Sequence, residues 1–429
     1  MTVSNLSTEL QIEIDDVYAC AGTCAGCQLS FNEKNSSQPD MKTNILHASI
    51  SRLKDYINQQ TGLERVNLTF GIGDHLRMDD EHLENIYTQG AHLLQDTGFI
   101  NSNSGIFITF SLVGNSEKIM HRLKKLHRLQ SNIPIVPIAV LDPLTMHKGG
   151  FGKKYTHLFQ QARQLFNAVD LTINLSTPTI RSMTAQQAYQ FAVDNGFTEL
   201  TINWTPTEKN FIQTCDDIEA TQNWRIDFDH CIEQDQRLSC SYRPVLKKTI
   251  DAVKCREQDT LSFRELVTNH IDGLARRSLQ IDESGHFFIK FEAIGDISQS
   301  PRFGYQALGN VQHDPIEATI NKKIKQISAR IIKAHTQSTS CMNCDYLHYC
   351  GLTGFHVYLD FLKSRRLSEN ADFLQNKAKF GEKAQFTGVT EYFEPDFNTA
   401  LEEKCVLGQP PKNEQCPHVA AALFKHYEH

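Results

Sequence analysis

The sequence predicts an α/β protein whose parallel strands are joined by helices. Two observations support this fold class. Short apolar segments typical of strands alternate with segments of helical periodicity, and six such strand–helix units lie between residues 11 and 220. Turns rich in Gly, Asn and Asp separate several of them. Repeated alternation implies parallel strands connected by right-handed crossovers, and therefore either a doubly wound sheet or a barrel, closed or partial.

Each unit can be placed in order along the chain. Strands are expected at residues 11–18, 65–70, 106–112, 134–141, 171–175 and 200–204. Helices are expected at residues 45–57, 81–94, 117–129, 155–166, 185–193 and 210–220. Residues 141–154, which contain three glycines and three lysines, are predicted to form a loop, either solvated or closing as a lid.

The pattern changes after about residue 235. A helix at residues 263–276 precedes a hairpin at 279–291 that turns at 283–285, and a turn at 308–310 leads into a helix at 315–334. We therefore expect three regions. The parallel α/β domain would occupy residues 1–235, a smaller α+β domain residues 236–365, and a C-terminal extension residues 366–429.

Composition indicates a soluble enzyme. The chain is 40% hydrophobic and 22% charged with a net charge of −7, and no strongly basic stretch could follow a phosphate backbone, so we expect no nucleic-acid partner. The first ten residues lack signal-peptide features, and no apolar run reaches the length of a membrane span. A cytoplasmic protein is expected. Twelve cysteines in a reducing compartment indicate metal or redox chemistry rather than disulfides.

Three cysteines lie close together directly after the first strand. Cys20, Cys24 and Cys27 form a C-x3-C-x2-C motif. Thiolates suit iron–sulfur clusters, and three on one loop can hold three irons of a 4Fe-4S cluster, which leaves the fourth iron open to a small molecule. The alternative is a zinc site. Zinc needs a fourth ligand, and the nearest downstream histidines, His47 and His75, are distant in sequence.

The motif and its position resemble those of the radical S-adenosylmethionine (SAM) enzymes. The resemblance implies a partial (β/α)6 TIM barrel with the cluster after the first strand and SAM on the open iron. In that family a Gly-Gly-Glu-Pro-like segment after the second strand binds the SAM amino group. Residues 71–74 are similar, which implies this role for Gly71, Gly73 and Asp74, with the aspartate in place of glutamate. Asn174 and Ser176, at the end of the fifth strand, would contact the SAM ribose or carboxylate.

A second cysteine group follows the helix predicted at residues 315–334. Together with the hairpin and the Leu-Gly-Asn turn, its C-x2-C-x5-C spacing resembles the SPASM extension, by which many radical SAM enzymes carry auxiliary clusters. Two cysteines of that pattern are missing here, and one of these positions is Gly354. The resemblance therefore implies one auxiliary 4Fe-4S cluster rather than two. Its ligands would be Cys341, Cys344, Cys350 and either Cys405 or Cys416. A structural zinc site is the alternative.

The resemblance implies an oxidoreductase that cleaves SAM reductively to a 5′-deoxyadenosyl radical, which then abstracts hydrogen from a substrate. SPASM-containing members most often modify a peptide or protein side chain, so we expect post-translational modification of a ribosomal peptide. Expected partners are an electron donor, such as flavodoxin or ferredoxin, and a separate leader-recognition partner, because the segment before the first strand is short. The alternatives are radical modification of a small metabolite and a non-catalytic, metal-stabilised interaction protein. No catalytic hydrogen donor is assigned.

Overall fold

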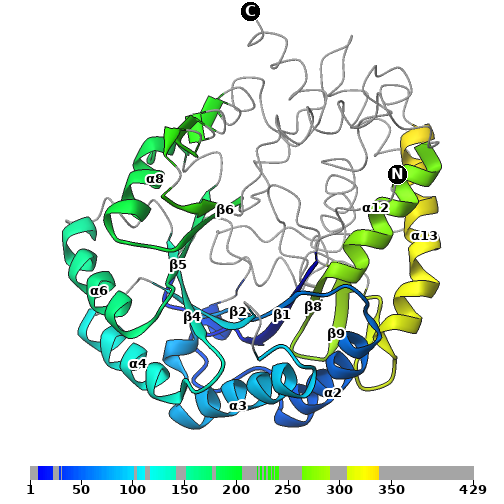
Figure 1. Ribbon diagram of the computed structural model, residues 1–429, viewed down its shortest axis with the longest axis horizontal. Helices are drawn as coiled ribbons and strands as arrows, with labels where there is room; N and C mark the ends of the chain where they lie inside the picture. The colour runs from blue at the N-terminus through cyan, green and yellow to red at the C-terminus, as the bar shows by residue number, and fades with distance from the viewer. Residues whose placement is uncertain are drawn as a thin grey trace, which may run out of the picture.

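The computed structural model describes residues 8–22, 29, 31–100, 104–111, 116–141, 151–175, 180–204, 263–289 and 307–337, with parts of 220–240. The ten strands within these residues form one open sheet in the order β10-β9-β8-β1-β2-β3-β4-β5-β6-β7. In this order, all neighbouring strands from β8 through β1 to β7 pair in parallel, whereas β9 pairs antiparallel with β8 and β10 pairs antiparallel with β9. The sheet curves, with helices on its outer side (Figure 1), so the fold is a partial α/β barrel, as predicted.

The first six strands and their helices follow the predicted order. The strands are β1 (Glu9–Val17), β2 (Arg65–Ile72), β3 (Gly105–Ser111), β4 (Ile135–Leu141), β5 (Asp170–Leu175) and β6 (Glu199–Trp204). The helices are α2 (Thr43–Gln59), α3 (Asp80–Asp96), α4 (Ser116–Leu129), α6 (Phe151–Leu165) and α8 (Ala185–Asp194). These six strands and five helices are confirmed. The sixth predicted helix, residues 210–220, lies almost wholly outside the described residues.

One expected boundary is wrong. The loop predicted at residues 141–154 is shorter, because α6 already begins at Phe151. Phe151 lies one helical turn before Tyr155, so it extends the apolar periodicity by a turn. Residues 142–150 lie outside the described part of the chain.

Side chains of alternate residues place the hydrophobic core between the sheet and the helices. On β1, Leu10, Ile12 and Ile14 are fully buried in the same core as the apolar residues of α2 and α3, and burial of such a side chain contributes roughly 1.5–3 kcal/mol. Glu13 alternates with them and therefore faces the concave side of the sheet. Thr172 occupies the corresponding face of β5. The concave face thus carries polar side chains on β1 and β5, whereas β4 presents Ile138 and Val140 there.

The predicted hairpin and long helix are also confirmed, whereas residues 309–310 of the predicted turn form a short strand. Helix α12 (Phe263–Arg277) precedes strands β8 (Ser278–Ile281) and β9 (His286–Ile289), which are followed by β10 (Gly309–Asn310) and α13 (Ile316–Gln337). Strand β8 pairs in parallel with β1, so the hairpin extends the barrel sheet at its first strand. The buried amide of Gln280 strengthens this junction by donating to Asp15 Oδ2 at 2.7 Å. The sequence did not predict this pairing, and the boundary at residue 235 stays a prediction.

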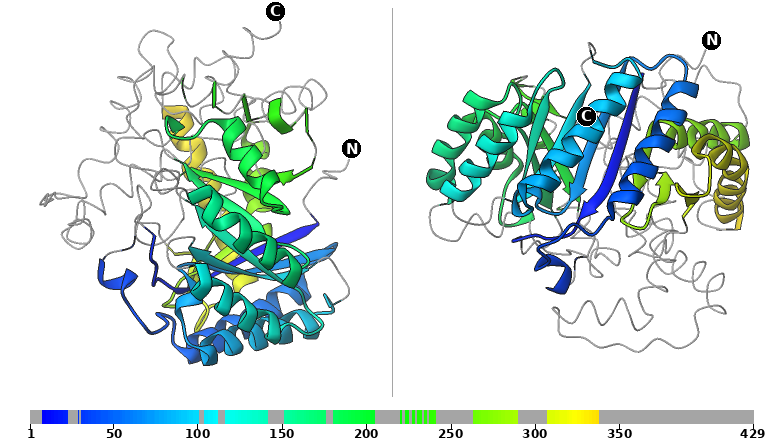
Figure 2. Two further views of the ribbon diagram at one scale, coloured as in Figure 1. Left: turned by 90° about the vertical axis from the view of Figure 1, so that its left-hand side faces the viewer. Right: turned by 90° about the horizontal axis from the view of Figure 1, so that it is seen from below.

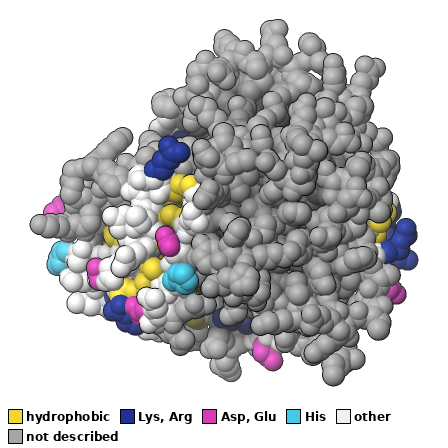
Figure 3. All heavy atoms as spheres, turned by 90° about the horizontal axis from the view of Figure 1, so that it is seen from above, with side chains coloured by type: hydrophobic (Ala, Val, Ile, Leu, Met, Phe, Trp, Pro, Cys, Tyr) yellow, Lys and Arg dark blue, Asp and Glu magenta, His cyan; other side chains and the backbone are white. Residues whose placement is uncertain are grey.

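A short strand, β7 (Ser239–Cys240), adds to β6 and was not predicted. No helix in the described residues combines the length and the apolar character that crossing a bilayer requires. Over the described part of the face in Figure 3, basic, acidic and histidine side chains are scattered among each other.

Candidate functional site

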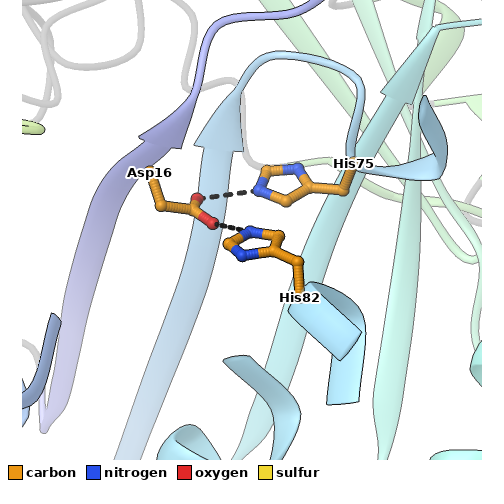
Figure 4. Close-up of side chains that lie close together, drawn as sticks. All are labelled: Asp16, His75 and His82. Atoms are coloured by element: carbon orange, nitrogen blue, oxygen red, sulfur yellow. Dashed lines mark hydrogen bonds and ion pairs between the residues drawn. The ribbon is translucent and has the colours of Figure 1, made fainter. Parts of the chain in front are cut away.

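A buried carboxylate bridges two histidines near the carboxyl end of β1. Asp16 Oδ1 lies 2.8 Å from Nε2 of His75, and Oδ2 lies 2.8 Å from Nε2 of His82. His75 begins the 3-10 helix η1 (His75–Arg77), which follows β2, and His82 lies in the first turn of α3. Figure 4 shows the carboxylate between the two rings, which are nearly parallel, with an interplanar angle of 13°.

Burial and mutual attraction set the charges in this group. Burial disfavours the ionised form of Asp16, but attraction to and hydrogen bonds from His75 and His82 outweigh it and lower the pKa of Asp16 to about 2. Burial acts to lower the pKa of His75, but its contacts with Asp16 and Thr109 raise that pKa above its usual value. The structure therefore favours an ionised Asp16 opposite a protonated His75.

Backbone contacts fix Asp16 in this position. The register between β1 and β2 is irregular between Ile14 and Val17, which is where Asp16 lies. The carbonyl of Asp16 accepts hydrogen bonds from the backbone N–H groups of Asp40 and Met41, at 2.9 and 3.1 Å. The strand end is thus attached to the chain that returns from the first cysteine loop.

The base of the first cysteine loop is closed by hydrogen bonds. Cys20 N–H donates to the carbonyl of Lys34, at 3.0 Å, and Lys34 lies at the end of α1 (Phe31–Lys34). The Lys34 ammonium donates to the carbonyl of Gly22, whose own N–H lies 3.2 Å from Cys20 Sγ. Helix α1 lies beyond the end of the sheet (Figure 2). Cys20 is a partly exposed free cysteine.

The turn after β2 is bound directly to this loop. Asp74 N–H donates to the carbonyl of Ala19, at 2.6 Å, immediately before Cys20. The Thr109 hydroxyl from β3 donates to the carbonyl of Gly73 at 2.8 Å. Asp74 caps η1 by accepting from Leu76 N–H, and burial raises the pKa of its carboxyl to about 6, although attraction to the neighbouring histidine opposes the rise. The carboxyl ends of β1, β2 and β3 therefore meet around Asp74.

Gly73 is required by the close approach of two chain segments. A Cβ atom at this position would lie 2.3 Å from the carbonyl oxygen of Val17 and 2.8 Å from that of Ala19. We expect Gly73→Ala to lower the free energy of unfolding by about 1–3 kcal/mol, because the backbone must move. Gly71→Ala is the matched control, since its Cβ would meet only the Glu13 side chain, no closer than 3.2 Å. Urea denaturation measures both variants, and equal losses would contradict this account.

The structure brings some of the predicted residues together. Cys20, Gly71, Gly73 and Asp74 lie at the ends of β1 and β2. Asn174 lies near the end of β5, opposite Asn203 of β6, at the same edge of the sheet but three strands from β2. Several predicted residues lie outside the described part of the chain. They are Cys24, Cys27, Ser176, Cys341, Cys344, Cys350, Cys405 and Cys416.

Sequence reasoning missed Asp16 and His82, and it considered His75 only as a distant zinc ligand. An acidic pair at the end of a strand and a histidine beside the Gly-x-Gly-Asp turn were visible signals. Neither signal shows that the side chains meet, because Asp16 is separated from His75 and His82 by 59 and 66 positions.

Comparison with known proteins yields similarity in fold only. No family model and no curated protein match this sequence. The solved structure of anSMEcpe with bound AdoMet is 13% identical, with a TM-score of 0.48, and the match covers 80% of this chain and 88% of that chain. SuiB from Streptococcus suis, bound to the precursor peptide SuiA, is 13% identical, with a TM-score of 0.49, and the match covers 89% and 76% respectively.

Proposed function

We propose that this protein is a radical SAM enzyme that cleaves SAM reductively and modifies a peptide or protein side chain. One observation carries the proposal. The N–H of Asp74 donates to the carbonyl of Ala19, so the turn suited to the SAM amino group is attached to the residue before Cys20. A cluster on the first cysteine loop and a sulfonium ligand at the turn would therefore be neighbours.

The residues at this edge fit the proposed cofactors. Cys20, Cys24 and Cys27 would hold the SAM-binding 4Fe-4S cluster, and a backbone N–H from Gly22 already points at the Cys20 sulfur, as suits a thiolate. When bound, the reduced cluster supplies the electron that cleaves SAM to methionine and a 5′-deoxyadenosyl radical. Asp74 would accept a charge-assisted hydrogen bond from the SAM ammonium.

The concave face of the sheet supplies the surface for SAM and substrate. Thr69, Thr172, Asn174 and Thr201 are partly exposed on β2, β5 and β6, on the face away from the helices. Hydroxyl and amide groups can orient a ribose or a peptide backbone through hydrogen bonds. Asn174, together with Ser176, would contact the SAM ribose or carboxylate. The protein thereby contributes binding and orientation, while the cofactors carry the radical chemistry.

The peptide substrate is the finer part of the proposal, and it rests on the SPASM resemblance. The hairpin β8–β9, the residues Gly309–Asn310, which form β10, and α13 occur in the expected order. The cysteines that would hold one auxiliary 4Fe-4S cluster follow α13 in the sequence. An electron donor such as flavodoxin or ferredoxin, and a separate protein that recognises the leader of the peptide, complete the proposed system.

Anaerobic turnover tests the proposal. The full-length protein, reconstituted with iron and sulfide and reduced with dithionite, should convert SAM to equal amounts of methionine and 5′-deoxyadenosine. Peptides encoded beside the gene are then supplied with deuterated side chains, and deuterium should appear in 5′-deoxyadenosine. Tightly bound zinc at the first cysteine loop, with no cleavage of SAM, would contradict the proposal. Cleavage with deuterium transfer only from a small metabolite would refute the peptide substrate alone.

A further inference from the structure

His75 bonds to the buried carboxylate of Asp16 and directly follows Asp74 in the sequence. We propose that His75 is a positioning residue that carries a positive charge in the folded protein and keeps Asp74 ionised for the SAM amino group. The role of Asp74 rests on the proposed function. The charge of His75 rests on the described contacts alone.

Both ring nitrogens of His75 face hydrogen-bond acceptors. Nε2 lies 2.8 Å from the Asp16 carboxylate, and Nδ1 lies 3.3 Å from the backbone carbonyl of Thr109. The Thr109 hydroxyl is also 3.4 Å from Nδ1, and it donates to the carbonyl of Gly73 at 2.8 Å, which leaves its oxygen to accept from the ring. A ring with acceptors at both nitrogens donates twice, and only the imidazolium form carries two N–H groups.

The contact distances favour hydrogen bonds over a shared metal ion. Each histidine Nε2 lies 2.8 Å from a different oxygen of Asp16, which is the separation of a charge-assisted N–H···O bond. A bridging ion would instead lie about 2.0–2.2 Å from each ligand atom, between the donors and the carboxylate. Asp16 therefore acts as the anion that compensates the charge of His75.

The ring of His75 is connected by hydrogen bonds to the elements around the turn that follows β2. It bonds to β1 through Asp16 and to β3 through Thr109, and it is fully buried. Through the second oxygen of Asp16 it is linked to His82 at the start of α3. Thr109 also holds the carbonyl of Gly73, so one residue of β3 contacts both the ring and the turn. The position of Asp74 is thus tied to the position of the cation.

Among the described residues, His75 is the principal buried cation that acts on the Asp74 carboxyl. Attraction to His75 is the largest influence that lowers the pKa of Asp74, and the exposed Arg77 adds a smaller one. From the neighbouring strand, Ser111 contributes a backbone N–H. Asp16 on β1 acts on the ring of His75, and His82 on α3 bonds to the other oxygen of Asp16.

Removal of this cation should change the titration of Asp74. With His75 present, the pKa of Asp74 is about 6, so the carboxyl is ionised at neutral pH. An opposite charge at this range typically lowers a carboxyl pKa by about 1–3 units, so a neutral residue at position 75 should raise it by at least about 1 unit. At pH 7 at least about half of the carboxyl groups would then be protonated, and the charge-assisted bond to an ammonium would weaken.

The pH dependence of SAM binding tests the inference in the full-length, reconstituted protein. In the wild type, affinity for SAM should fall below a midpoint near pH 6. In His75→Gln this midpoint should move upward by at least about 1 unit, and the affinity for SAM should recover at high pH. His75→Asn serves as the variant if His75→Gln does not fold. His82→Gln is the matched control. It removes the other bond to Asp16 but leaves the residue beside Asp74, so its midpoint should remain near pH 6.

Two measurements without SAM separate this inference from the proposed function. Nitrogen-15 labelling of histidine should show both ring nitrogens of His75 protonated at pH 7, and carbon-13 labelling of aspartate reads the titration of Asp74 directly. If SAM never binds but the Asp74 titration moves upward in His75→Gln, the proposed function fails and the inference stands. A neutral His75 ring, or an unchanged Asp74 titration, overturns the inference. A divalent ion that the wild type binds and that both His75→Gln and His82→Gln release would also overturn the inference.

Discussion

Replacing Cys20, Cys24 and Cys27 together by alanine is expected to remove one 4Fe-4S cluster per chain and to abolish formation of 5′-deoxyadenosine from SAM. The three thiolates are the proposed protein ligands of the cluster, so the cluster has no binding site once they are removed. Without the cluster, no electron reaches the sulfonium of SAM. Iron and sulfide content, electron paramagnetic resonance of the reduced protein and chromatography of the nucleoside products measure the effect.

The second cysteine group provides an internal comparison. Alanine at Cys341, Cys344 and Cys350 should remove the auxiliary cluster, leave the first cluster in place and still allow SAM cleavage without substrate. Cys231→Ala is the matched thiol control, because Cys231 is a partly buried free cysteine outside both groups, and its iron content should equal that of the wild type. Loss of zinc instead of iron in either triple variant would refute the iron–sulfur assignment of that group.

Replacing Asp16 by alanine is expected to lower the free energy of unfolding by about 3–5 kcal/mol, the usual cost of removing one partner from a buried charged pair. The Asp16 side chain is 1% exposed, and the variant leaves two buried histidine nitrogens without their acceptor. Urea denaturation at pH 6 measures the loss. Asp80→Ala is the surface control, since its ion pair with Lys125 is largely exposed and should contribute no more than about 1 kcal/mol.

The loss caused by Asp16→Ala should also depend on pH. The pKa of Asp16 falls from 3.8 to about 2 on folding, so its contribution is complete above pH 3.8 and declines as the pH falls toward 2. The pKa of His75 is raised from 6.5, so the contribution of its charge is complete below pH 6.5 and is lost as the pH rises through the folded value. The difference between wild type and variant should therefore be largest between about pH 4 and 6.5. A difference that does not vary with pH would mean that the pair is not ionised.

Local patterns in the sequence determined much of this protein. The alternation of Leu10, Ile12 and Ile14 along β1, and the apolar spacing along α3, predicted elements that the structure confirms to within a few residues. The Gly71–Asp74 turn was recognised for the same reason, because backbone propensity and hydrophobic periodicity act over neighbouring residues. The three closely spaced cysteines after β1 likewise needed only their spacing to indicate a metal cluster.

Only the tertiary structure decided which distant segments meet. It placed β8 beside β1 and joined Gln280 to Asp15. It also brought Asp16 to His75 and His82, which no periodicity connects. Partners in such contacts are chosen by the packing of whole elements around a common core, and burial then makes their charges depend on each other. For this reason the sequence suggested Asp74 as a ligand, whereas the fold revealed the cation that would keep it ionised.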